Sequence, residues 1–213
     1  MSARQRRLIA EASVLFVLAP LLGALLLPPN EMFAMLFAMT GLGLVLLHVT
    51  PGFQWRELVH GWRRVDWRFV AAMGCVTAFA GYGIVRVTAP EAVFFPAREM
   101  PGLMVMIAVL YPVLSALPQE VLFRPLFFRR YAPILPGPRA AVALNAAVFS
   151  LAHLMYWSWI VAVLTFAGGL AFAHAYRAHG FPTAVAAHAV AGVVAFGVGL
   201  GVYFYSGNVV RPF

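Results

Sequence analysis

Long apolar runs alternate with short polar segments along the whole chain. Each run holds about 20 residues, which is enough for an α-helix to cross a ~30 Å hydrocarbon layer. The runs predict seven membrane-spanning helices, at residues 8–28, 31–49, 69–88, 102–128, 140–157, 159–176 and 183–205. Two breaker segments, Pro28-Pro29-Asn30 and Pro51-Gly52, mark the first two turns. The predicted fold class is therefore all-α, a polytopic transmembrane helical bundle.

Composition supports this fold class and favours one domain. Of 213 residues, 63% are hydrophobic and only 10% are charged, which is too little charge to cover the surface of a soluble domain. The sequence shows no internal repeat, no low-complexity linker and no second domain. We therefore expect a single integral-membrane domain over residues 1–213, with the lipid bilayer as a partner.

The net charge of +8 comes from 15 arginines, which lie mostly in the short segments between apolar runs. A basic chain raises the question of nucleic acid, but arginines in short loops are what membrane topology requires. We expect no nucleic acid partner. With the N-terminus inside, the inner segments hold eleven arginines and the outer segments three, while Arg124 lies within a span. Because cytoplasmic loops carry the excess of arginine, this bias predicts an inside N-terminus.

The segment from Phe53 to Arg68 combines arginines with aromatic residues between two predicted spans. Trp55, Leu58 and Trp62 fall on one helical face, and arginines surround the rest. This pattern predicts a short helix that lies in the inner headgroup region. A topology-setting loop with aromatic anchors explains the segment better than a recognition role does.

Among the seven acidic residues, Glu120 alone lies well inside a predicted span, and Arg124 is the only arginine of comparable depth. A spacing of four places both side chains on one helical face, where they can pair. An ionisable group in a span costs several kcal/mol and is a functional candidate by default. A structural ion pair between helices is the alternative.

Three polar or aromatic residues follow at spacings of four in the next span: Asn145, Phe149 and His153. They form one stripe that can face the interior of the bundle. The last span adds His188, with Gly192 one turn later. Two intramembrane histidines and a carboxylate on a third helix favour a site over isolated core residues.

Such a cluster supports two chemistries that the sequence does not separate. A carboxylate beside imidazole can act as a general base toward water, and imidazoles can donate to an oxyanion. The same three residues, Glu120, His153 and His188, also match the ligand set of a catalytic zinc site. Depth counting puts Glu120 and His188 toward the inner leaflet and His153 nearer the outer one. A helix break at Pro112 and Pro118 would change the depth of the Glu120 segment.

Three motifs in order resemble those of the CPBP family, which includes type II CAAX prenyl proteases, bacteriocin-processing enzymes and Abi-like proteins. The first is Pro118-Gln119-Glu120-Val121-Leu122-Phe123-Arg124, similar to E-E-x-x-x-R. The second, Phe149-Ser150-Leu151-Ala152-His153, matches F-x-x-x-H, and the third is His188-Ala189-Val190-Ala191-Gly192. The resemblance covers about residues 102–205.

This resemblance implies an intramembrane endopeptidase of the glutamate type, formerly described as a metalloprotease. It would hydrolyse peptide bonds of a membrane-associated peptide or protein, and we expect it in a bacterial plasma (inner) membrane. Glu120, His153 and His188 would be the catalytic residues: Glu120 would contact the supporting Arg124, His153 would help activate water, and His188 would help bind the oxyanion. Asn145 and Phe149 would lie nearby. The resemblance leaves the cofactor open, with zinc held by the same Glu120, His153 and His188 if it is present.

Two positions depart from the family pattern. Gln119 stands where the family has its presumed general base, and Gly192 stands where the third motif usually has asparagine or aspartate. Either Glu120 takes over as the base, or the protein is a catalytically inactive member that serves as an immunity or scaffold protein. A small transporter or proton relay is a third hypothesis, which the lack of an inverted repeat disfavours.

Overall fold

A computed structural model describes residues 1–212, so Phe213, the last residue of the predicted domain, lies outside the described residues. Residues 1–212 form helices, turns and short connections, without a β-strand. The α-helices are α1 (Ala3–Ser13), α2 (Ala19–Leu26), α3 (Met32–His48), α4 (Arg56–Val59), α5 (Trp67–Thr88), α6 (Phe95–Glu99), α7 (Pro101–Tyr111), α8 (Leu117–Val121), α9 (Pro138–Leu151), α10 (Trp159–His179), α11 (Phe181–Val198) and α12 (Gly201–Phe204). Wider π-helical turns continue some of them end to end, at Val14–Leu18, Pro112–Ala116 and Leu122–Arg130.

Seven helical stretches within residues 1–212 are long and apolar enough to cross a membrane, and the chain is an integral membrane protein. They are Ala3–Leu26, Pro29–His48, Trp67–Thr88, Pro101–Arg130, Pro138–Tyr156, Trp159–His179 and Phe181–Val198. Each of them overlaps one predicted span. The all-α fold class and the number of spans are therefore confirmed, while the inside N-terminus stays a prediction.

The last span is shorter than predicted, because α11 ends at Val198 and not near residue 205. Gly199 follows with a φ of +108°, and a Cβ atom on it would lie 2.1 Å from the carbonyl oxygen of Ala92. Only glycine tolerates both the left-handed backbone and this close approach. The chain turns there and forms the separate short helix α12.

The fourth span is not broken by its prolines, in contrast to the break considered at Pro112 and Pro118. Residues Pro101–Arg130 form one helical stretch of 30 residues. Pro112 begins one π-helical segment, and Pro125 lies inside the other. Because a π-helical turn is wider, it accommodates prolines without ending the helix.

The segment between the second and third spans is only partly helical. Helix α4 covers four residues, and Gly61, with a φ of +96°, ends any continuation of it before a single 3₁₀ turn. The prediction of one short helix along the segment is therefore wrong in its second half. Trp55 and Trp62 are nevertheless both exposed, as residues that anchor a chain at a membrane surface are.

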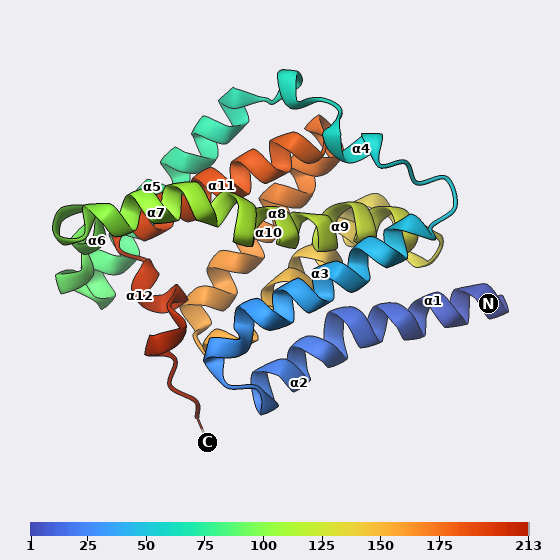
Figure 1. Cartoon of the computed structure of the whole chain (residues 1–213), viewed down its shortest axis with the longest axis horizontal. Helices are drawn as coiled ribbons and strands as arrows, with labels where there is room; N and C mark the ends of the chain where they lie inside the picture. The colour runs from blue at the N-terminus through green and yellow to red at the C-terminus, as the bar shows by residue number, and fades with distance from the viewer. Residues whose placement is uncertain (213) are drawn as a thin grey trace.

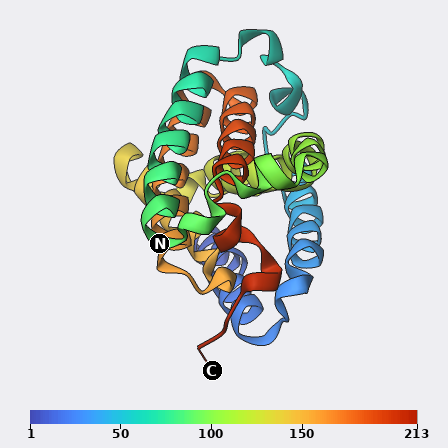
Figure 2. The same cartoon turned by 90° about the vertical axis from the view of Figure 1, so that its left-hand side faces the viewer.

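The fourth span lies between two groups of helices. Helix α10 packs against α9 and α11, and α11 packs against α5. On the other side, α1, α2 and α3 form a helical hairpin (Figure 1). The fourth span crosses the molecule between them and contacts α11 on one side and α3 on the other, as a second view also shows (Figure 2). This position buries the residues that follow Leu117.

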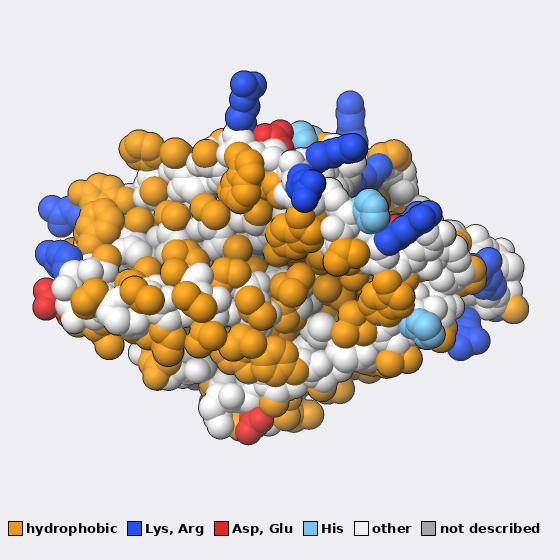
Figure 3. Space-filling view, turned by 45° about the horizontal axis from the view of Figure 1, so that its top comes forward, with side chains coloured by type: hydrophobic (Ala, Val, Ile, Leu, Met, Phe, Trp, Pro, Cys, Tyr) orange, Lys and Arg blue, Asp and Glu red, His pale blue; other side chains and the backbone are white. Residues whose placement is uncertain are grey.

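The outer surface has the character expected of a membrane protein. Apolar side chains are spread over the whole face in Figure 3, and the arginine side chains gather over its upper and right-hand parts and at its left end. In a soluble protein so large an apolar face would indicate an aggregation hazard or an interface. In this chain it lies over the spanning helices and indicates contact with lipid.

Candidate active site

Glu120 and Arg124 form a fully buried ion pair on the fourth span. Arg124 Nε donates to Glu120 Oε2 at 2.8 Å, and Nη2 donates to Oε1 at 3.2 Å. Neither side chain has any exposed surface. The spacing of four residues predicted this pair, and the structure confirms it. Because arginine stays protonated in proteins, the geometry holds Glu120 as the partner carboxylate.

Arg124 also connects the fourth span to α9. It donates a hydrogen bond to the side-chain oxygen of Asn145, whose Nδ2 in turn donates to the Phe123 carbonyl oxygen at 2.6 Å. The guanidinium carbon lies 5.2 Å from the centroid of the Phe149 ring and 5.9 Å from that of Phe172. Bonded on its edge and covered by aromatic rings, Arg124 is a fixed charge with little freedom to move.

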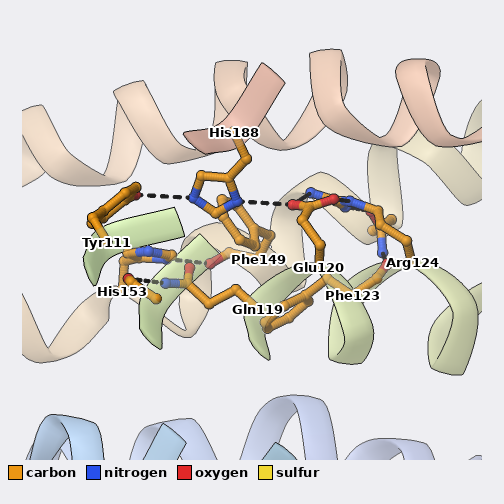
Figure 4. Close-up of polar contacts among 10 residues, drawn as sticks. Tyr111, Gln119, Glu120, Phe123, Arg124, Phe149, His153 and His188 are labelled. Carbon is orange, nitrogen blue, oxygen red and sulfur yellow. Dashed lines mark hydrogen bonds and ion pairs between the residues drawn. The ribbon is translucent and has the colours of Figure 1, made fainter. Parts of the chain in front are cut away.

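His188 extends this network from α11. Its Nδ1 lies 2.9 Å from Glu120 Oε1, and its Nε2 lies 3.1 Å from the hydroxyl oxygen of Tyr111. The imidazole stacks on Phe172, with a centroid distance of 4.6 Å and an interplanar angle of 10°. A carboxylate only accepts, so Nδ1 carries the hydrogen toward Glu120. In the neutral tautomer with its hydrogen on Nδ1, the ring accepts the Tyr111 O–H at Nε2. Figure 4 shows the continuous row of bonds.

Tyr111 is a site residue that the sequence analysis did not select. Its ring lies against Gly192: a Cβ atom there would be 2.1 Å from Tyr111 Cε1 and 2.5 Å from its hydroxyl oxygen. The absence of a side chain at Gly192 is therefore what makes room for the tyrosine. A phenol in an apolar span is a weak signal in a sequence, because tyrosine is also common where helices meet the headgroups.

His153 and Gln119 form a second, more open part of the site. His153 Nδ1 lies 2.7 Å from the Phe149 carbonyl oxygen, so Nδ1 donates and Nε2 is the basic nitrogen of the neutral ring. Gln119 Nε2 donates to Ser115 Oγ at 2.9 Å, while its side-chain oxygen is buried without a hydrogen-bond partner. A buried acceptor without a partner is costly and marks a place for a donor.

A cavity of about 110 Å³ lies beside this second part of the site. Its polar wall contains Ser115, Gln119, His153 and Tyr156, and apolar side chains from the first two spans form the rest. Methionines contribute to that apolar wall, namely Met32, Met35, Met39 and Met155. Methionine adapts its shape to different apolar ligands. The cavity is thus an apolar pocket with one polar wall.

The predicted residues therefore fall into two groups. Glu120 and His188 are in direct contact, and Arg124 and Asn145 belong to the same network. His153 is not part of that network and bonds to the Phe149 carbonyl oxygen of its own helix. The Phe149 ring packs against both imidazoles, with centroid distances of 4.7 Å to His153 and 5.7 Å to His188. The cavity wall includes His153 and not Glu120.

The residues do not fit a zinc ion held by Glu120, His153 and His188. Residues 1–212 contain no group of three histidine, cysteine, aspartate or glutamate side chains placed to hold a metal. Both oxygens of Glu120 already accept from Arg124, and both nitrogens of His188 are hydrogen-bonded. A cation between them would have to displace a guanidinium that is packed in place.

These features define a class of protein: a helical membrane protein with a buried glutamate–histidine–arginine network beside a pocket that contains a second histidine. Residues 101–194 match the family described as type II CAAX prenyl endopeptidase Rce1-like. The chain therefore carries a domain of this family, the CPBP or Abi group, and the resemblance seen in the motifs is confirmed. The family is one of intramembrane endopeptidases. No curated protein and no solved structure matches the chain.

Proposed function

We propose that this protein is an intramembrane endopeptidase that hydrolyses a peptide bond of a membrane-associated peptide or protein. The observation that carries the proposal is the hydrogen bonding of His153. Its Nδ1 is bound to the backbone carbonyl of Phe149, which leaves Nε2 as the basic nitrogen, and the side chain lines the cavity. A neutral imidazole with one fixed nitrogen is suited to general-base catalysis. Membership of the family domain supports peptide-bond hydrolysis as the reaction.

In the proposed reaction His153 Nε2 accepts a proton from water, and the water oxygen adds to the substrate carbonyl carbon. His153 then returns that proton to the leaving amine nitrogen as the C–N bond breaks. Gln119 cannot act as a base, but its unpaired oxygen can accept the second hydrogen of the same water and orient it. In the family pattern one glutamate is the presumed general base. In this proposal His153 takes the proton from water, and the amide of Gln119 orients that water.

Glu120 has a different role in this proposal from the base considered in the sequence analysis. It has no exposed surface, and its oxygens bind Arg124 and His188. A carboxylate that is fixed in this way holds His188 in one tautomer and orientation, as the acid of a catalytic triad does. The other nitrogen of His188, Nε2, in turn contacts the hydroxyl of Tyr111.

The proposal is tested by mapping new peptide N-termini in membranes from cells that produce the wild type or His153→Ala. We expect a set of membrane-protein N-termini that the wild type generates and His153→Ala does not. His60→Ala, a change at a histidine outside the site, is the matched control and should cleave like the wild type. Identical N-termini for the wild type and His153→Ala, at equal protein levels, would refute the proposal.

A second candidate function is binding without hydrolysis, as an immunity or scaffold protein. The observation that favours it is the pair of departures at Gln119 and Gly192, which removes the acid and the amide that the family motifs supply. It predicts that the cellular phenotype of a deletion is rescued equally well by the wild type and by His153→Ala. Endopeptidase function predicts rescue by the wild type alone.

A further inference from the structure

The positions of Tyr111 and Gly192 are complementary in volume. A side chain at Gly192 would overlap the tyrosine ring, since even a Cβ atom would lie 2.1 Å from Cε1 and 2.3 Å from Cζ. Real Cβ atoms do not approach other atoms so closely, so the tyrosine in this position requires glycine. An asparagine at position 192 and the present Tyr111 exclude each other.

The chemistry of the two positions is complementary as well. Gly192 offers no side-chain donor, and the Tyr111 hydroxyl occupies the adjoining space with an O–H group. That hydroxyl lies 3.1 Å from His188 Nε2, and its ring packs edge-on against the imidazole. When a neutral His188 donates from Nδ1 to Glu120, its Nε2 is an acceptor, and the O–H donor of this pair is then Tyr111.

Tyr111 lies one turn before the residues of the fourth span that line the cavity, while its ring packs on α11. Ser115 and Gln119 follow it at spacings of four, and both line the cavity. In the view of Figure 4, Tyr111 is the end of the hydrogen-bonded row that lies nearest to His153. The hydroxyl therefore ends the buried row of hydrogen bonds, one helical turn from Ser115 in the cavity wall.

We infer that Tyr111 is a catalytic residue that donates a hydrogen bond to the oxyanion of the tetrahedral intermediate, in place of the side-chain donor that Gly192 lacks. The inference rests on the proposed endopeptidase function. When the carbonyl oxygen gains negative charge, the Tyr111 O–H turns from His188 Nε2 to that oxygen, and no proton is transferred. Loss of one such donor lowers kcat by about 10²–10³-fold.

The test uses a synthetic peptide that carries a cleavage site identified in the N-terminus mapping, and purified protein in liposomes. Tyr111→Phe should lower kcat by about 10²-fold and leave KM within about threefold, because the donor acts on the intermediate and not on the bound substrate. Tyr82→Phe, at an exposed tyrosine on α5, is the matched control and should keep the wild-type kcat. Thermal unfolding of each variant verifies that the fold is retained.

A rescue experiment separates a donor from a packing role. Tyr111→Ala opens the space at Gly192, and Tyr111→Ala/Gly192→Asn then places an amide donor in it. We expect this double variant to recover at least tenfold in kcat over Tyr111→Ala/Gly192→Ala, which fills the space without a donor. Gly192→Asn alone should lower the thermal stability, because the asparagine overlaps Tyr111.

The outcomes distinguish this inference from the function on which it rests. If the wild type hydrolyses the peptide and Tyr111→Phe matches its kcat, the role of Tyr111 is refuted and the endopeptidase function stands. If the wild type does not hydrolyse a peptide bond in any membrane substrate, the endopeptidase function fails and the inference falls with it. Equal kcat for the two double variants would also overturn the donor role.

Discussion

At the scale of single residues, Glu120 and Arg124 are held by a hydrogen-bonded network in a fully buried environment. Transfer of either charge into such an environment is costly, and their attraction offsets this only because the remaining polar atoms are also bonded. Asn145 and His188 supply those bonds. The network therefore depends on all of its members, and removal of one leaves a buried charge or acceptor without a partner.

Arg124→Met tests this dependence, because it leaves the carboxylate of Glu120 buried and unpaired. We expect the free energy of unfolding to fall by about 3–5 kcal/mol, measured by denaturant titration in detergent micelles. Arg129→Met is the matched control: Arg129 pairs with Glu57 in a partly exposed position, where such pairs contribute about 0–1 kcal/mol. An equal loss in the free energy of unfolding for both variants would show that the buried ion pair contributes no more to stability than the partly exposed one.

The sequence allowed the ionisable residues of the candidate site to be selected. Glu120, Arg124 and His188 stand out because ionisable groups are rare within spans, and the contact between Glu120 and Arg124 follows from helical spacing. Tyr111 could not be predicted in this way, because its place depends on a glycine that is distant in the chain. In the sequence, Gln119 is only a departure from the family motif. Its role is indicated by its unpaired side-chain oxygen, on a residue that lines the cavity together with His153.

At the scale of the helices, the second motif is positioned by the close packing of α9 on α10. Gly169 of α10 faces Ala146, and a Cβ atom on Gly169 would lie 2.9 Å from the Ala146 Cα atom and 3.2 Å from the Phe149 ring. Small residues at such contacts let two membrane helices approach closely. The backbone that carries Phe149 and His153 therefore has little room to move.

Gly169→Ala should disturb this contact, because the added methyl group meets backbone atoms that cannot rotate away. We expect a loss of about 1–3 kcal/mol in the free energy of unfolding, together with reduced peptide cleavage. Gly83→Ala introduces the same methyl group at a position with open space around it, and serves as the control. A Gly169→Ala protein as stable and active as the wild type would contradict the packing account.

The helices themselves were largely predictable, because apolar runs of spanning length have few alternative structures in a bilayer. The ends were less so. The stop at Gly199 depends on a tertiary contact with Ala92, and the interfacial segment is interrupted by the left-handed Gly61. The continuity of the fourth span through Pro112 and Pro125 depends on π-helical turns, which hydrophobic periodicity does not reveal.

At the scale of the whole molecule, the fold separates a buried charged network from an apolar pocket. The fourth span contributes side chains to both. The fourth span lies between the first two spans, which line the pocket, and α11, which carries His188. A membrane substrate that enters from the side of α3 would meet His153 and Gln119 before it met the buried pair. With the N-terminus inside, as the arginine distribution predicts, the pair would lie toward the cytoplasmic leaflet.

The most direct test of the central claim is the initial rate at which purified protein in liposomes hydrolyses the identified peptide, with and without His153. The account predicts turnover by the wild type in the presence of a metal chelator, and a rate about 10²–10⁴-fold lower for His153→Gln. Folding is verified by thermal unfolding of both proteins. Equal rates for the two proteins, or activity that the chelator abolishes and zinc restores, would contradict the account.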